Sequence, residues 1–254
     1  MSGIGTGYDL SGSTYSPDGR VFQAEYACKA VDNAGTTVGI KCADGVLLAS
    51  ERSVESKMSV PGAPAARRIM AVDRHAGVAC AGLVPDGRQL AFRARAECAN
   101  YASFFGDRIP ARVLADRLAS YMHLYTLYWS VRPYGATAVM ATCDPDKNEP
   151  LLFVAEPTGV CHSYRACACG RGRQSVRTDL ERLDLETLTT DAAIKEVAKL
   201  MLKAKDESSK RETEIEMAVI GTATNGIFQR VPDNVVQNAV DVAKAEIDAD
   251  MEDD

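Results

Sequence analysis

Two long helical stretches that follow one another without a strand between them most limit how this chain can fold. The first covers residues 86–105, and the second covers residues 111–129, directly after Pro110, a common opening of a first helical turn. Both carry apolar residues at helical spacing: Leu90, Ala94 and Cys98 in the first, and Leu114, Leu118, Met122 and Tyr125 in the second. With strands on both sides, such a helix pair indicates segregated blocks rather than alternating βαβ units.

Short apolar runs bounded by turn residues predict the strands. They lie at residues 36–42, 46–50, 68–72 and 76–81 before the helix pair, and at 136–142, 151–155, 160–164, 166–169 and 214–221 after it. Further helices are expected at residues 20–31, 172–182, 190–205 and 232–247. Two mostly antiparallel sheets with helices on both outer faces would bury all of these apolar faces. We therefore expect an α+β fold, a four-layer αββα sandwich.

This arrangement leaves room for one domain, over residues 15–247. Residues 1–14 are small, Gly-rich and polar, and are expected to form an N-terminal tail. Residues 248–254 (DADMEDD) are acidic and are expected to form a disordered C-terminal tail.

The composition excludes several classes of protein. Hydrophobic residues make up 46% of the 254 and charged residues 25%, which is ordinary for a soluble globular protein. No apolar stretch of about 18 residues occurs, and the first residues lack the features of a secretory signal, so we expect neither a membrane span nor secretion. The net charge of −6 argues against nucleic-acid binding. The eight cysteines are then expected to be reduced thiols of a cytoplasmic or nuclear protein.

A metal site is one alternative for the stretch CHSYRACAC, through Cys161, His162, Cys167 and Cys169. The spacing matches no common zinc pattern. Because Cys167 and Cys169 are two residues apart on a predicted strand, they would share one face and act as small core residues. We expect no metal and no cofactor.

Two further features allow both a ligand site and a structural explanation. Gly170-Arg171-Gly172 precedes a predicted helix and could cradle a phosphate, but the turn needs glycine in any case. The aromatic run of Tyr121, Tyr125, Tyr128 and Trp129 could form a ligand box, but packing against a sheet is expected.

Gly35-Thr36 raises the question of catalysis. A threonine directly after a glycine, at the start of an apolar strand, could be the nucleophile of a self-processing hydrolase. It could equally be a hydroxyl residue that opens an ordinary strand.

Several motifs resemble those of a known family. Tyr8-Asp9-Leu10 and residues 15–27 (YSPDGRVFQAEYA) resemble the N-terminal signature of proteasome alpha subunits. Further matches are 36–40 (TTVGI), 44–45 (DG), 72–75 (VDRH), 81–83 (AGL), 131–135 (VRPYG), 157–159 (PTG) and 168–170 (ACG). Within the family the chain most resembles the alpha-7 position, and the family fold is the αββα sandwich.

The resemblance also indicates that the chain is not a protease, although the family's beta subunits are threonine proteases. The nucleophile position matches Gly35, so Thr36 lies one residue too far along, and on a strand this reverses the side-chain direction. The position of the assisting Asp matches Glu51, and that of the Lys matches Arg68, which stays protonated and cannot shuttle a proton. The alternative is an autoprocessed hydrolase with Thr36 exposed.

The resemblance assigns other residues to access control. Tyr8 and Asp9 match residues that hold a gate together with the turn at Pro17 and Tyr26 of a neighbouring subunit, whereas Leu10 departs from the usual Arg. In addition, Ala34, Arg68 and Leu83 match a pocket that docks the C-terminal tails of activators.

The partners implied by the resemblance are other proteasome alpha subunits in a seven-membered ring, a beta ring below it and regulatory particles above it. The implied process is ubiquitin-dependent and ubiquitin-independent protein degradation in the cytoplasm and nucleus. No nucleic acid and no membrane are expected as partners.

Overall fold

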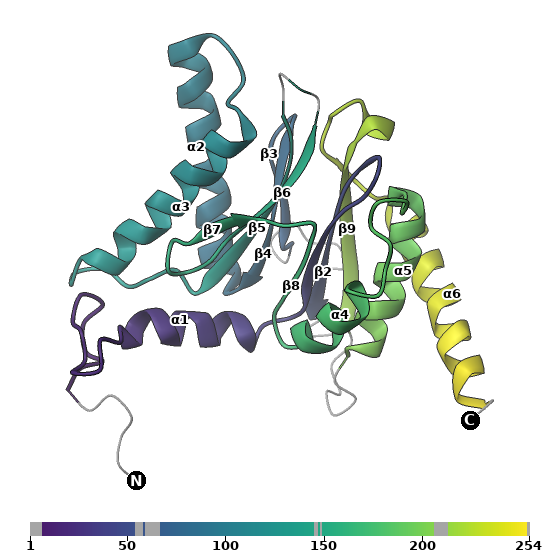
Figure 1. Cartoon of the computed structure of the whole chain (residues 1–254), viewed down its shortest axis with the longest axis horizontal. Helices are drawn as coiled ribbons and strands as arrows, with labels where there is room; N and C mark the ends of the chain where they lie inside the picture. The colour runs from purple at the N-terminus through teal and green to yellow at the C-terminus, as the bar shows by residue number, and fades with distance from the viewer. Residues whose placement is uncertain are drawn as a thin grey trace.

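A computed structural model describes residues 7–53, 58, 67–144, 147, 149–205 and 213–252. Its strands form two antiparallel five-stranded sheets (Figure 1). One has the order β10-β9-β2-β1-β8, with β10 Gln229–Arg230, β9 Thr213–Gly221, β2 Gly45–Ser53, β1 Thr37–Lys41 and β8 Ala166–Cys169. The other has the order β3-β4-β5-β6-β7, with β3 Ile69–Asp73, β4 Ala76–Gly82, β5 Ala136–Cys143, β6 Pro150–Ala155 and β7 Cys161–Ser163.

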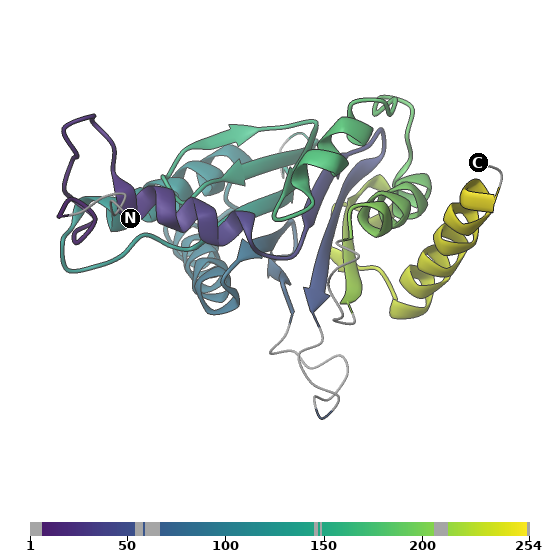
Figure 2. The ribbon, with the colours of Figure 1, turned by 90° about the horizontal axis from the view of Figure 1, so that it is seen from below.

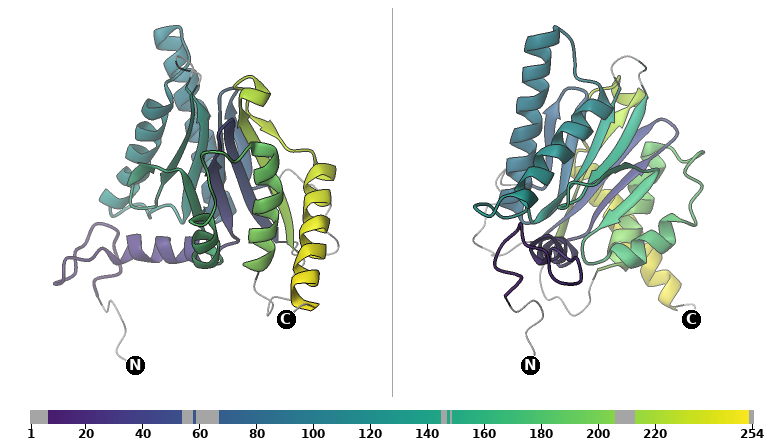
Figure 3. Two further views of the ribbon diagram at one scale, coloured as in Figure 1. Left: turned by 45° about the vertical axis from the view of Figure 1, so that its right-hand side comes forward. Right: turned by 60° about the vertical axis from the view of Figure 1, so that its left-hand side comes forward.

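Helices cover both outer faces of the paired sheets. On the β3–β7 sheet lie α2 (Val84–Phe105) and α3 (Ala111–Leu127), and on the other lie α4 (Arg173–Leu180), α5 (Thr190–Lys203) and α6 (Asp233–Glu252). Figure 3 (left) shows the order of the layers, with α2 and α3 on one side, the two sheets in the middle, and α5 and α6 on the other. This confirms the predicted αββα sandwich.

Three apolar layers hold the sandwich together. One lies between each sheet and its helices, and the third lies between the two sheets, where Val46, Leu48, Val139 and Ile220 are buried. The sheets approach each other closely at Gly39: a Cβ there would lie 2.9 Å from side-chain atoms of both Leu152 and Val139. A larger residue cannot occupy this position without displacing the opposite sheet.

Helix α1 (Phe22–Asp32) lies outside the four layers. It runs across one end of the sandwich (Figure 2) and contacts β4 and β5. Its buried residues are Phe22, Ala24, Ala27 and Val31. Since α1 leads directly into β1, the residues just after it lie at this same end.

Two sequence predictions about surface and termini are wrong. Tyr128 and Trp129 are 58% and 81% exposed, so only Tyr121 and Tyr125 of the aromatic run pack against the core. Helix α6 continues to Glu252, into the segment expected to be a disordered tail. The strand β10 and the 3-10 turn η2 (Thr222–Thr224) were not predicted, because two- and three-residue elements carry no periodicity.

Two other features of the described residues bear on the class of protein. Cys167 and Cys169 are buried between the sheets, which confirms their expected role in the core. In this part of the chain, no helix combines the length and apolar character needed to cross a membrane.

Candidate functional site

Thr36 is buried and fully engaged in local structure. It is 3% exposed, its backbone N–H donates to Glu51 Oε2 at 3.0 Å, and its Oγ1 accepts the N–H of Gly172 at 3.2 Å. Its carbonyl accepts the N–H of Glu51 at 2.8 Å. A nucleophilic threonine needs a free amine and an accessible hydroxyl. Here the nitrogen is a peptide nitrogen and the hydroxyl is already bonded.

The glycines around Thr36 are explained by close packing. A Cβ at Gly35 would lie 2.9 Å from the carbonyl oxygen of Glu51. Gly170 has φ +93°, and a Cβ there would lie 2.5 Å from the carbonyl oxygen of Gly35. The N–H of Arg171 donates to the carbonyl of Ala34 at 2.9 Å. Since the amides of Arg171 and Gly172 are both bonded to protein, the turn interpretation of this segment is favoured over a phosphate cradle.

Asp9 and Tyr26, two of the predicted gate residues, lie together within one chain. The hydroxyl of Tyr26 is 3.4 Å from Asp9 Oδ2, and Gln23 Nε2 donates to the Asp9 carbonyl. Partial burial and the Asp9 carboxylate raise the pKa of Tyr26. The contact of Tyr26 with a neighbouring subunit stays a prediction.

Pro17 lies in a closed turn just before α1. Ser16 accepts the N–H of Gly19 at 2.9 Å and donates its own N–H to the Arg20 carbonyl at 2.9 Å. Gly19 has φ +75°, a conformation that favours glycine. Two backbone hydrogen bonds therefore close the turn, and Pro17 lies on its exposed side.

The other residues of the N-terminal segment differ in exposure. Tyr8 is half-exposed and Leu10 is 87% exposed, whereas Gly12 is buried against the loop that carries Tyr128 and Val131. Residues 1–6 of the predicted gate tail lie outside the described residues.

Arg68 and Leu83, two of the predicted docking residues, lie near each other because the Arg68 side chain binds the backbone of Gly82, the residue before Leu83. Arg68 Nη1 donates to the carbonyl of Gly82 at 2.8 Å, and the N–H of Leu83 donates to the carbonyl of Gly135 at 2.9 Å. The Leu83 side chain remains 46% exposed. The third residue, Ala34, follows the last turn of α1, with its N–H donating to the Val31 carbonyl at 3.0 Å.

An ion pair between the buried Asp86 and the exposed Arg132 supports this segment and was missed in the sequence. Asp86 is 8% exposed and binds both terminal nitrogens of Arg132, at 2.6 and 2.9 Å, and the N–H of Gly135 at 2.8 Å. Burial opposes ionisation of Asp86, but the bonds from Arg132 and Gly135 outweigh it and lower the pKa of the carboxyl. The pair thus fixes Gly135, which holds the backbone of Leu83.

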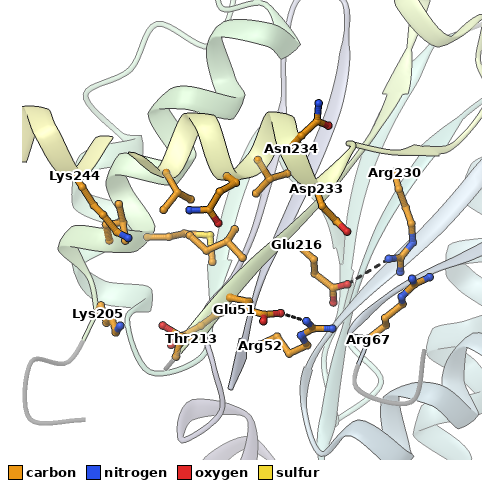
Figure 4. Close-up of a pocket in the computed structure, with 17 residues that line it drawn as sticks. Glu51, Arg52, Arg67, Lys205, Thr213, Glu216, Arg230, Asp233, Asn234 and Lys244 are labelled. Atoms are coloured by element: carbon orange, nitrogen blue, oxygen red, sulfur yellow. Dashed lines mark ion pairs between the residues drawn. The ribbon is translucent and has the colours of Figure 1, made fainter. Parts of the chain in front are cut away.

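A cavity of about 560 Å³ opens between α5, α6 and the ends of β2 and β9 (Figure 4). Its lining combines apolar side chains of α5 and α6 with charged ones: Arg52 pairs with Glu214, and Arg230 Nη1 lies 3.6 Å from Glu216 Oε2. Of the residues that the sequence singled out, Glu51 lines it. The available signal was the charged Glu216 inside the apolar strand at 214–221, but no sequence pattern indicates that Arg230 is the residue that faces it.

The described ranges contain no candidate set of metal ligands. Within them, no group of three or more His, Cys, Asp and Glu residues could hold a metal ion.

Comparisons with known proteins identify relatives along the whole chain. Residues 31–220 match the family model described as "Proteasome subunit", and residues 8–30 match the model of the N-terminal signature of A-type proteasome subunits. The chain is 49% identical over 253 residues to the alpha type-3 proteasome subunit of Spinacia oleracea, covering 98% of this chain and 100% of that protein. It is 47% identical over 253 residues to the probable alpha type-7 proteasome subunit of Schizosaccharomyces pombe, covering 100% of this chain and 98% of that protein.

Proposed function

The chain belongs to the proteasome alpha-subunit family, and from this premise we propose that it is a non-catalytic alpha subunit of the 20S core particle. The matched signature at residues 8–30 is that of the alpha type, and the relatives cover nearly their full lengths. The relative of Spinacia oleracea is named alpha type-3 and that of Schizosaccharomyces pombe alpha type-7, two names for the same position of the ring. Both align over nearly the whole chain, which favours this alpha-7 position.

The observation that carries the non-catalytic assignment is the state of Thr36. Cleavage before this residue would remove α1, which packs on β4 and β5; in the uncleaved chain the Thr36 nitrogen is a peptide nitrogen that donates to Glu51. The residue at the assisting-lysine position is Arg68, whose guanidinium stays protonated and is bonded to the Gly82 carbonyl. The proteolytic activity of the complex, of the threonine type, would then reside in its beta subunits.

Assembly into a seven-membered alpha ring, with a beta ring below, accounts for exposed apolar side chains. Leu127, Tyr128 and Trp129, which are consecutive in the sequence at the end of α3, are 51%, 58% and 81% exposed. A large exposed apolar patch commonly marks a protein–protein contact. In a ring of heterologous contacts, each subunit buries one face against each neighbour.

The N-terminal segment would gate access to the central chamber. Its described part is anchored at Asp9 by Tyr26 and Gln23, and at Gly12 by the loop after α3. An anchored base next to a Gly-rich tail can hold that tail across a pore and still allow it to move. The exposed Leu10, in place of the usual Arg, would make the gate asymmetric at this position of the ring.

Regulatory particles would dock their C-terminal tails near Arg68, Leu83 and Ala34. Arg68 can pair with a tail carboxylate, and the half-exposed Leu83 offers an adjacent apolar contact. The particle would act in ubiquitin-dependent and ubiquitin-independent protein degradation, in the cytoplasm and nucleus.

Native mass spectrometry of material purified through a C-terminal affinity tag tests this proposal. We expect the tagged chain, at its unprocessed mass near 27.3 kDa, inside a large particle with other proteasome subunits. Recovery of the chain alone, or of a chain that begins at Thr36, would contradict the proposal.

A further inference from the structure

Strand β3 is the edge of its sheet, and its first residue has backbone groups that point away from the neighbouring strand. The carbonyl of Arg68 accepts the N–H of Cys80 in β4 at 3.0 Å. Because successive residues of a strand direct their backbone groups to opposite sides, the N–H and carbonyl of Ile69 point outward. An unpaired strand edge is unfavourable unless other groups cover it.

Two side chains from the opposite sheet cover this edge. Glu216 Oε1 accepts the N–H of Ile69 at 3.0 Å, and Arg230 Nη2 donates to the Ile69 carbonyl. Arg230 also faces Glu216 (Figure 4), and its Nη1 lies 3.6 Å from Glu216 Oε2. The side chain of Glu216 is only 13% exposed, so this carboxylate is committed to these partners.

The same carboxylate holds Arg68. Glu216 Oε1 also accepts the backbone N–H of Arg68, one residue before Ile69. From this fixed backbone the Arg68 guanidinium reaches the Gly82 carbonyl, next to Leu83, whereas the preceding Arg67 lines the cavity of Figure 4. The direction of the Arg68 side chain thus depends on where Glu216 holds the start of β3.

We propose that Glu216 is a positioning residue for Arg68 and thereby sets the affinity of this subunit for the C-terminal carboxylate of a regulatory tail. The inference rests on the proposed docking function of Arg68. The direction of the change in affinity is diagnostic. If Glu216 acted only through its charge, its removal would strengthen binding of the tail carboxylate. If Glu216 positions Arg68, its removal weakens that binding.

The test measures photo-crosslinking of a tail peptide to this chain in assembled particles. The probe is a synthetic peptide with the C-terminal sequence of a regulatory-particle subunit, prepared with a free carboxylate and with a C-terminal amide. The half-saturating concentration for crosslinking to this chain gives the local affinity. In the native particle we expect the amide to need at least about tenfold more peptide, since one charge-assisted hydrogen bond is lost.

Three variants separate positioning from charge. Glu216→Ala removes the acceptor. The ratio of the half-saturating concentrations, amide peptide over carboxylate peptide, should then fall to within about twofold of one, with the affinity for the amide peptide unchanged. Glu216→Gln keeps an acceptor oxygen and should retain most of the ratio. The matched control is Glu214→Ala on the same strand, whose carboxylate pairs with Arg52; it should leave the ratio as in the native particle.

The outcomes distinguish this inference from the docking proposal. If the native particle shows no preference for the carboxylate, or if Arg68→Gln leaves the preference intact, docking at Arg68 is wrong. If Arg68→Gln abolishes the preference but Glu216→Ala keeps or increases it, the positioning role is wrong. Should the Glu216→Ala chain not enter particles, Glu216→Asp replaces it: its carboxylate is one methylene shorter and loses the reach to the Arg68 N–H, with the same fall expected and the same contrary result.

Discussion

The carboxylate of Glu51 accepts the backbone N–H of Thr36 at 3.0 Å, so the residue most similar to a proteolytic nucleophile is held by its own peptide nitrogen. The chain should therefore remain uncut before Thr36. Thr36→Ala should leave peptide hydrolysis by the particle unchanged, and intact-mass measurement should find the full chain. Hydrolysis that falls with Thr36→Ala, but not with Thr36→Ser, would contradict this account.

Tyr26→Phe should loosen the gate. The substitution removes the hydroxyl that lies 3.4 Å from Asp9 Oδ2 and keeps the ring. Basal hydrolysis of a fluorogenic peptide by particles without activator should rise, by about two- to fivefold for the loss of one hydrogen bond of roughly 0.5–1 kcal/mol. Tyr15→Phe is the control, because Tyr15 is 70% exposed. An equal rise in both variants would count against a specific role of Tyr26.

Asp86→Asn should destabilise the full-length chain. The substitution keeps the shape but removes the charge that binds Arg132 and the N–H of Gly135. We expect a loss of about 1–3 kcal/mol in the free energy of urea unfolding at pH 7. The control is Glu186→Gln in the exposed pair with Arg165, which should change the stability by less than about 0.5 kcal/mol. Equal effects would contradict the structural importance of the buried Asp86 carboxylate.

The pH dependence of the same variant gives a second check. The pKa of Asp86 is lowered in the folded protein. Its contribution to stability is therefore present above the ordinary aspartate pKa of about 4, and is lost as the pH falls through the lowered folded value. The stability difference between the native chain and Asp86→Asn should shrink as the pH falls below about 4. A constant difference down to acid pH would show that the charge is not responsible.

Gly39→Ala should destabilise the chain by overpacking the space between the sheets. The new Cβ would lie 2.9 Å from side-chain atoms of Leu152 and Val139, and the expected loss in the free energy of unfolding is about 1–3 kcal/mol. Gly12→Ala serves as a control, because its nearest contact would be an ordinary 3.6 Å. Urea unfolding of both variants measures the contrast, and a neutral Gly39→Ala would mean that the sheets can separate without cost.

Much of the fold was predictable because its long elements carry clear periodicity. The helix pair and the strands from β1 to β9 occur where apolar spacing and turn residues place them, within a few residues at the ends. The exposure of Tyr128 and Trp129 was not predictable, because an aromatic side chain at a helix end packs inward or outward according to the next loop. The last turns of α6 were missed because their acidic composition is typical of a tail.

The candidate site was predictable only through local motifs and resemblance. Tyr8, Asp9, Pro17 and Tyr26 lie in a contiguous signature, which makes them visible in the sequence. The bond between Glu216 and Arg68 joins β9 to the residue directly before β3, 148 positions away, and no local pattern encodes it. The same holds for Asp86 and Arg132, whose pairing depends on how α2 meets the loop after α3.

Deletion of residues 1–12 tests the central claim most directly, namely that this chain controls access rather than cutting peptides. The variant chain should assemble, because the turn at Pro17 and α1 remain, and the particle should hydrolyse a small fluorogenic peptide several-fold faster without activator. Deletion of residues 248–254 is the matched control and should leave the basal rate unchanged. Assembled particles in which the N-terminal deletion leaves basal hydrolysis unchanged, or lowers it, would contradict the account.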